Sequence, residues 1–235
     1  FGPKQVLNGI DLEVHKGETF AIMGPSGCGK SVTIRHVIGL LKPDRGLVEV
    51  WGRDMSTISR ADLREMRSRM GYVFQEAALL NWLSAGDNVA LPLMIAGYRY
   101  AEIRKRVRGA LKMVGLEERE RDWPLALSGG EQQRVGVARA VVAMPPVLLA
   151  DEPTGNLDPE LSWELFGLFR NLNERGVTIL IDRPFKTGDW ITLTGADGVV
   201  EEIGLAPIRA LVRQSVFEHL PAAGLDEAHA GLLPA

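Results

Sequence analysis

The sequence has 235 residues, a length that allows one α/β domain or two smaller ones, either large enough to bury a core. Hydrophobic residues make up 46% and charged residues 24%, which excludes a disordered or low-complexity chain as the main interpretation. The net charge is -3, whereas affinity for a phosphate backbone comes mainly from clustered Lys and Arg. We therefore expect no nucleic-acid partner.

The single cysteine, Cys28, excludes an internal disulfide and fits a reducing compartment. The longest apolar stretch, residues 140–150, contains two prolines and is well short of the roughly 20 residues that cross a bilayer. The start of the chain has neither the basic nor the apolar region of a signal peptide. We expect no membrane span and no leader in this sequence. The chain opens without Met, which leaves open whether residues precede it.

Short runs with β character alternate with helical patterns over the first 181 residues. This alternation predicts the α/β class, with a mostly parallel sheet flanked by helices. The predicted strands are 19–23, 48–51, 71–74, 147–151 and 177–181.

Three helices have readable boundaries. One follows Ser59, which has the form of a capping box with Asp62, and one runs from Pro159 to near Arg175. The third, over 98–114, is amphipathic. Its predicted apolar face consists of Ile103, Val107, Leu111 and Val114.

A glycine-rich segment, GPSGCGKS at residues 24–31, lies between a predicted strand and a predicted helix and matches G-x-x-x-x-G-K-S. Glycines let successive backbone N–H groups turn toward phosphate oxygens, and the helix N-terminus adds positive potential. Lys30 is then expected to reach the β and γ phosphates of ATP, and the Ser31 hydroxyl to bind Mg²⁺. A turn without a ligand is the weaker interpretation, because Lys and Ser follow at the required offset. The nucleotide-binding residues expected here are Gly24, Pro25, Ser26, Gly27, Cys28, Gly29, Lys30, Ser31 and Val32.

Two carboxylates, Asp151 and Glu152, end the apolar run at 147–150. A buried parallel strand delivers such residues to the crevice at its carboxyl end. We expect Asp151 to hold Mg²⁺, directly or through water, and Glu152 to polarise the attacking water. The alternative is a solvated acidic turn before Pro153, and the phosphate loop makes it the weaker interpretation.

The segment LSGGEQQR, residues 127–134, lies between these two motifs and opens a predicted helix. Ser128 and Glu131 form a capping-box pattern, so the simplest alternative is a well-capped helix and nothing more. Together the three motifs resemble those of the ABC transporter ATPase family over residues 1–181. The resemblance implies a P-loop ATPase domain with a helical signature subdomain at about 76–143. It also implies a head-to-tail homodimer in which Ser128, Gly129, Gly130 and Glu131 meet ATP bound by the opposite subunit.

Three further positions match the family. By this resemblance Phe1 would stack on adenine, although it could instead be a terminal core residue. Gln75 would bind Mg²⁺ and contact the membrane partner, the alternative being an inert polar residue at a strand end. Asp158 would belong to the loop that crosses the dimer, the alternative being a helix N-cap.

The chain resembles two groups within the family. Residues 89–180 resemble the bacterial cell-division ABC ATPase, whereas residues 17–46 resemble phospholipid-trafficking ATPases of the Mla type. Both groups drive a separate integral-membrane subunit, so the resemblance implies a permease-like partner. It also implies a cytoplasmic protein, peripheral on the inner face of the bacterial plasma membrane. It leaves the substrate, and the choice between cell division and lipid transport, open.

The family pattern ends at residue 181. The family has a histidine shortly after this strand, which contacts the γ-phosphate, whereas no histidine occurs here between His36 and His219. Residues 182–208 instead resemble the β-domain of small-conductance mechanosensitive channels, so the chain resembles a mosaic. No pore helix precedes this segment, which argues against a channel. The pattern around 195–198 predicts a hairpin that could complete the sheet, and residues 209–235 are predicted to be a helical or disordered tail.

Three functions follow from this mosaic. The first is an ABC-type ATPase with impaired hydrolysis, because the switch histidine is absent. The second is an ATP-gated binding module with little turnover. The third is a non-functional chimera.

Overall fold

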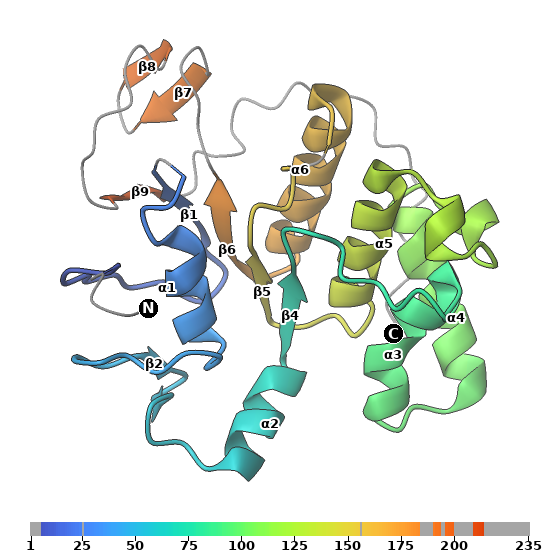
Figure 1. Cartoon of the computed structure of the whole chain (residues 1–235), viewed down its shortest axis with the longest axis horizontal. Helices are drawn as coiled ribbons and strands as arrows, with labels where there is room; N and C mark the ends of the chain where they lie inside the picture. The colour runs from blue at the N-terminus through green and yellow to red at the C-terminus, as the bar shows by residue number, and fades with distance from the viewer. Residues whose placement is uncertain are drawn as a thin grey trace.

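The computed structural model describes residues 6–24, 26–155, 157–183, 190–193, 196–199 and 209–213. At its centre is a five-stranded sheet of order β4-β5-β6-β1-β9 (Figure 1). Four strands run parallel, as predicted: β1 (Thr19–Met23), β4 (Met70–Val73), β5 (Val147–Ala150) and β6 (Thr178–Arg183). The fifth, β9 (Arg209–Arg213), pairs antiparallel with β1. The predicted α/β class is confirmed.

The helices flank this sheet in two groups. Figure 1 shows α1 on the left near the N-terminus, α2 at the bottom below β4, and α3, α4 and α5 gathered on the right beyond β4. The helices are α1 (Lys30–Val37), α2 (Arg60–Ser68), α3 (Ala85–Ile95), α4 (Tyr100–Met113), α5 (Gly129–Val141) and α6 (Pro159–Glu174). Two 3₁₀ turns, η1 (Glu117–Arg119) and η2 (Pro124–Ala126), connect α4 to α5.

One predicted strand has a different role. The run 48–51 contributes β2 (Glu49–Val50), which pairs antiparallel with β3 (Arg53–Asp54) and not with the parallel sheet. The reason is the turn that follows it. Trp51 and Gly52 have φ values of 50° and 75°, the pair of positive angles that a tight two-residue hairpin requires. The chain therefore folds back at once, without crossing to the central sheet.

The C-terminal strands depart from the prediction in their connections. The predicted hairpin exists, as β7 (Trp190–Leu193) paired with β8 (Ala196–Val199). Residues 196–198, which were predicted to lie around the turn, pair within β8. The hairpin forms its own two-stranded sheet, and β9 extends the central sheet instead.

Strand β9 also corrects the predicted helical tail at residues 209–213. The edge of β1 offers unpaired backbone N–H and C=O groups, and an extended segment satisfies them where a helix would not. Residues 214–235 lie outside the described part of the chain.

The predicted helix boundaries hold closely. Ser59 caps α2, because its side chain accepts from the backbone N–H of Asp62 at 3.1 Å. In a capping box the Asp62 carboxylate would accept from the Ser59 backbone N–H; here it accepts from the Ser59 hydroxyl instead. Asp158 caps α6, which ends one residue before Arg175. The predicted apolar face of α4 is buried as a whole: Ile103, Val107, Leu111 and Val114.

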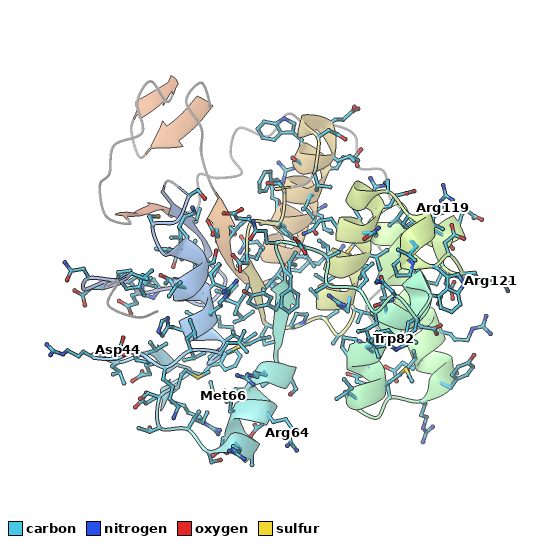
Figure 2. The ribbon with its side chains drawn as sticks, in the orientation of Figure 1. Asp44, Arg64, Met66, Trp82, Arg119 and Arg121 are labelled. Atoms are coloured by element: carbon cyan, nitrogen blue, oxygen red, sulfur yellow. The ribbon has the colours of Figure 1, made fainter. Side chains whose placement is uncertain are left out.

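Two clusters of buried side chains cover the two faces of the sheet. Strand neighbours divide between them: Leu148 packs with the cluster under α3 to α6, and Leu149 with the cluster under α1 and α2. Figure 2 labels Met66 and Arg64 on α2; Met66 is buried in the second cluster, and Arg64 is exposed. The sheet is therefore covered on both faces, as is usual for parallel sheets. Across the residues described, no helix has the length and apolar character to span a bilayer.

Asn88 anchors the segment before α3. This fully buried side chain accepts from the N–H of Leu80 at 2.8 Å and donates to the carbonyls of Leu80, Leu83 and Ser84. Asn88→Ala should lower the free energy of unfolding by about 2 kcal/mol, because it leaves these buried groups unpaired. Urea denaturation measures the loss. Asn81→Ala, at an exposed position, should leave the midpoint unchanged and serves as the control.

Candidate functional site

The carboxyl ends of the four parallel strands meet at one edge of the sheet. The phosphate-loop motif follows β1, Gln75 follows β4, and Asp151 with Glu152 follows β5. This edge is where open α/β sheets bind ligands, because the loops after the strands leave a crevice there.

The loop from Gly24 to Lys30 has the backbone that its glycines require. Gly27 and Gly29 have φ values of 79° and 105°, which other residues rarely adopt. A Cβ on Gly29 would also lie 2.6 Å from Leu7 Cδ2. Helix α1 begins immediately after, and the Lys30 ammonium donates to the Gly24 carbonyl at 2.9 Å. Pro25 lies outside the described residues.

Asp151 is buried at the end of β5, with 2% of its surface exposed. It accepts from the Tyr72 hydroxyl at 3.0 Å, and the Arg35 guanidinium lies 3.7 Å away. Burial and the negative charge of Asp151 raise the pKa of Tyr72, so the phenol stays a neutral donor. The second carboxylate oxygen, Oδ1, has no hydrogen-bond partner among the described residues.

Glu152 and Gln75, 77 positions apart in the sequence, meet in the structure. The Gln75 amide donates to the Glu152 carboxylate at 2.9 Å. Glu152 has a φ of 46°, a strained backbone angle for this residue type. Nearby, the buried Gln133 amide on α5 donates to the Phe74 carbonyl at 2.9 Å and so supports the loop that carries Gln75. The two proposed catalytic side chains therefore lie together.

Asp182 is a site residue that the sequence reasoning missed. It is fully buried on β6, its Oδ1 lies 3.6 Å from the Lys30 ammonium, and its Oδ2 accepts from the Ser31 hydroxyl at 3.3 Å. Burial is the main cause that raises its pKa to about 7, against the opposing charge of Lys30 and with a smaller contribution from the neighbouring Glu152 and Asp151 carboxylates. The signal that could have found it is a carboxylate at the end of the strand that follows Asp151 in the chain.

The signature motif opens α5 with a complete capping box. Ser128 accepts from the Glu131 N–H, and the Glu131 side chain accepts from the Ser128 N–H at 2.8 Å. That second bond is the main reason that the pKa of Glu131 is lowered. Ser128 and Gly129 are exposed, and α5 is separated from α1 by the width of the sheet (Figure 1). Within one chain, this end therefore lies away from the phosphate loop.

Arg119 supports the start of α5 from the side. Its guanidinium lies 3.5 Å from the Glu131 carboxylate and 3.0 Å from that of Asp122. Figure 2 shows Arg119 with Arg121 and Trp82 on the α3–α5 side of the molecule.

The remaining predicted positions have separate outcomes. Phe1 lies outside the described residues, so its contact with adenine stays a prediction. Asp158 accepts from the Leu161 N–H at 2.9 Å, which is the N-cap alternative; the structure of one chain does not test a role across a dimer.

The residues present fit a nucleotide with a divalent cation. The glycine cradle has no room for a side chain at Gly29, and the buried Oδ1 of Asp151 has no hydrogen-bond partner within the part of the chain that the structure describes. Among the described residues, no three His, Cys, Asp or Glu side chains are arranged to hold a metal by themselves. A cation here would therefore need nucleotide oxygens as additional ligands.

Comparison with known proteins agrees with this geometry. The sequence model of the ABC transporter family matches residues 7–155. The chain belongs to the ABC transporter family. This places it among the ATP-binding-cassette ATPases, as predicted.

Two curated relatives cover most of the matched region. The cell division ATP-binding protein FtsE of Escherichia coli is 44% identical over 180 residues, which is 77% of this chain and 81% of the relative. The methionine import ATP-binding protein MetN of Brucella abortus is 46% identical over 182 residues, or 77% of this chain and 49% of the relative. The chain thus spans about half the length of MetN. The cell-division resemblance is confirmed; the lipid-trafficking one stays a prediction.

Solved structures support the same fold. The dimeric, post-hydrolysis cassette MJ0796 bound to ADP and Pi has a TM-score of 0.72 and 37% identity, covering 75% of this chain and 79% of its own. The cassette cbiO1 of Clostridium perfringens has a TM-score of 0.69 and 33% identity, covering 77% and 72%.

A second family description, the β-domain of mechanosensitive ion channels, matches residues 168–210. The predicted resemblance of this segment is therefore confirmed, with an earlier start than the predicted 182. The segment that matches the channel β-domain includes the end of α6 and all of β6. It therefore begins within the folded α/β domain.

Proposed function

We propose that this chain binds MgATP, forms a head-to-tail dimer around it and hydrolyses it. The observation that carries the proposal is the Gln75–Glu152 hydrogen bond beside buried Asp151, at the same sheet edge as the phosphate loop. A general base, a polar positioning group and a buried carboxylate are the parts that water attack on a bound phosphate requires.

Each part has one role. The loop N–H groups and Lys30 bind the β and γ phosphates, and Glu152 holds and deprotonates the attacking water. Ser31, Gln75 and Asp151 would hold Mg²⁺, which would neutralise phosphate charge. Tyr72 and Arg35 fix the Asp151 carboxylate, because both lie against its Oδ2 and leave Oδ1 open to the cation or its water.

The dimer follows from the exposed signature end. Ser128, Gly129 and Gly130 lie away from the phosphate loop of their own chain, so they can meet a γ-phosphate only across an interface. The related cassette MJ0796 is dimeric in its solved structures, which supports the formation of a dimer. ATP, but not ADP, should hold the two chains together.

A membrane partner is part of the proposal. FtsE acts in cell division and MetN in methionine import, so we infer a permease-like membrane subunit and a position on the cytoplasmic face of the membrane. Gln75 is exposed, and the loop that carries it would transmit movement between the nucleotide site and the membrane subunit.

Lys30→Ala tests the nucleotide site directly. The substitution should weaken ATP binding at least about tenfold, because a charge-assisted bond of this kind contributes about 1.5–3 kcal/mol. Isothermal titration calorimetry measures the change. Lys16→Ala removes an exposed charge before β1 and should leave affinity unchanged. Equal affinity in folded Lys30→Ala protein would contradict the proposed site.

A second candidate is a nucleotide-gated binding module with little turnover. The observation in its favour is that β6 continues into Asp182 and Arg183, and that no histidine occurs between His36 and His219. Loss of a histidine that contacts the γ-phosphate removes stabilisation of the transition state and leaves ground-state binding of ATP largely intact. Phosphate release by protein that binds ATP separates the two functions: steady release supports the ATPase, and binding without release supports the module.

A further inference from the structure

Asp182 places a carboxylate inside the phosphate-binding machinery. Its backbone is level with Ile22 in the β1–β6 ladder, two residues before the glycine that opens the loop. Asp182 is 0% exposed and Lys30 is 3% exposed. The two side chains therefore face each other in the interior and not in water.

The carboxylate contacts the same groups that the proposed function assigns to the ligand. Oδ1 lies 3.6 Å from the Lys30 ammonium, and Oδ2 accepts from the Ser31 hydroxyl at 3.3 Å. A triphosphate would need that ammonium for its β and γ oxygens, and its cation would need that hydroxyl. Asp182 thus contacts the same two groups that a bound triphosphate and its cation would need.

Removing Lys30 from this pair has a cost. Oδ1 accepts no hydrogen bond from the described residues, and the Asp151 and Glu152 carboxylates are close enough to act on Asp182 electrostatically. A buried charge that loses its partner is strongly destabilised. Phosphate oxygens arriving at Lys30 would add further negative charge at short range, where the low dielectric of the interior strengthens repulsion.

We propose that Asp182 is an internal competitor for the phosphate-binding lysine, which weakens nucleotide binding and makes it depend on a divalent cation that offsets the charge. The inference rests on the proposed nucleotide site and adds its regulation. A cation held by Ser31 together with the nucleotide would add positive charge near Asp182 and would offset its repulsion of the phosphates. Nucleotide without a cation must instead displace the carboxylate unaided.

Asp182→Asn tests the competition, because it removes the charge and keeps the shape. We expect its affinity for ATP in EDTA at pH 8 to rise at least about tenfold, and its affinity for MgATP to rise by no more than about threefold. Titration calorimetry measures both. AMP, whose single phosphate does not reach Lys30, should bind equally to both proteins. Asp54→Asn makes the same charge change on β3, outside the parallel sheet, and should have no effect.

Asp182→Val places an apolar residue in the strand and serves as a second variant in case the amide variant misfolds. Its affinities for ATP in EDTA and for MgATP should change in the same way. Unchanged ATP affinity in EDTA for both folded variants would overturn the proposal. Weaker MgATP binding with unchanged binding in EDTA would also overturn it, because Asp182 would then assist the cation. These outcomes differ from failure of the nucleotide site itself, in which the unmodified protein would bind no MgATP.

Discussion

Glu152→Gln is expected to slow MgATP hydrolysis by about 10²- to 10⁴-fold, the contribution typical of a positioned general base. The amide is nearly isosteric but does not take a proton from water. Asp151 and its Tyr72 contact are untouched, so MgATP should still bind. Steady-state phosphate release measures the first effect, and titration calorimetry the second. Glu49→Gln, an exposed carboxylate on β2, is the matched control and should retain full turnover.

The same variant should accumulate as a dimer with ATP. When hydrolysis stops, the γ-phosphate stays between the phosphate loop of one chain and Ser128 of the other. Multi-angle light scattering should give twice the monomer mass with ATP, and the monomer mass with ADP. A monomer under both conditions would count against the sandwich, and unchanged turnover would remove Glu152 from the role of base.

The local motifs were predictable because their chemistry is encoded in contiguous residues. The loop at 24–31 and the capping box at Ser128 each need only a few neighbours, and the structure places both at helix starts. The run 48–51 was predicted as a strand correctly but assigned to the wrong sheet, because its partner is decided by the turn at Trp51 and Gly52. Strand β9 was missed because the open edge of β1, lying 190 positions earlier, selects its conformation.

The site residues that sequence patterns did not predict are those held by contacts between distant positions. Tyr72 reaches Asp151 across 79 positions, and Ser31 reaches Asp182 across 151. No local pattern specifies either pairing. They follow from strand order, because β4, β5, β6 and β1 are consecutive neighbours and present their last residues side by side. Once the order β4-β5-β6-β1 is known, a polar residue at any of these four strand ends becomes a candidate for the site.

Introducing a histidine after β6 is expected to raise turnover about 10²- to 10³-fold, the range measured for one donor that stabilises a developing oxyanion. The positions to change are Arg183 and Pro184, which follow Asp182 directly. An imidazole there would donate to the γ-phosphate in the transition state, whereas ground-state contacts through the phosphate loop would stay as they are. The gain should therefore lie in kcat, with little change in the affinity for MgATP.

Arg183→Ala and Pro184→Ala change the same positions without adding the donor, and their turnover should stay near that of the unmodified protein. If turnover rises as much in the alanine variants as in the histidine variants, the gain comes from removing the original side chain and not from the imidazole. Rapid hydrolysis by the unmodified protein would remove the need for the missing group altogether. If histidine restores turnover only when Asp182 is also changed to Asn, the buried carboxylate and the absent donor both limit the reaction, because the carboxylate would otherwise still hold Lys30 at 3.6 Å.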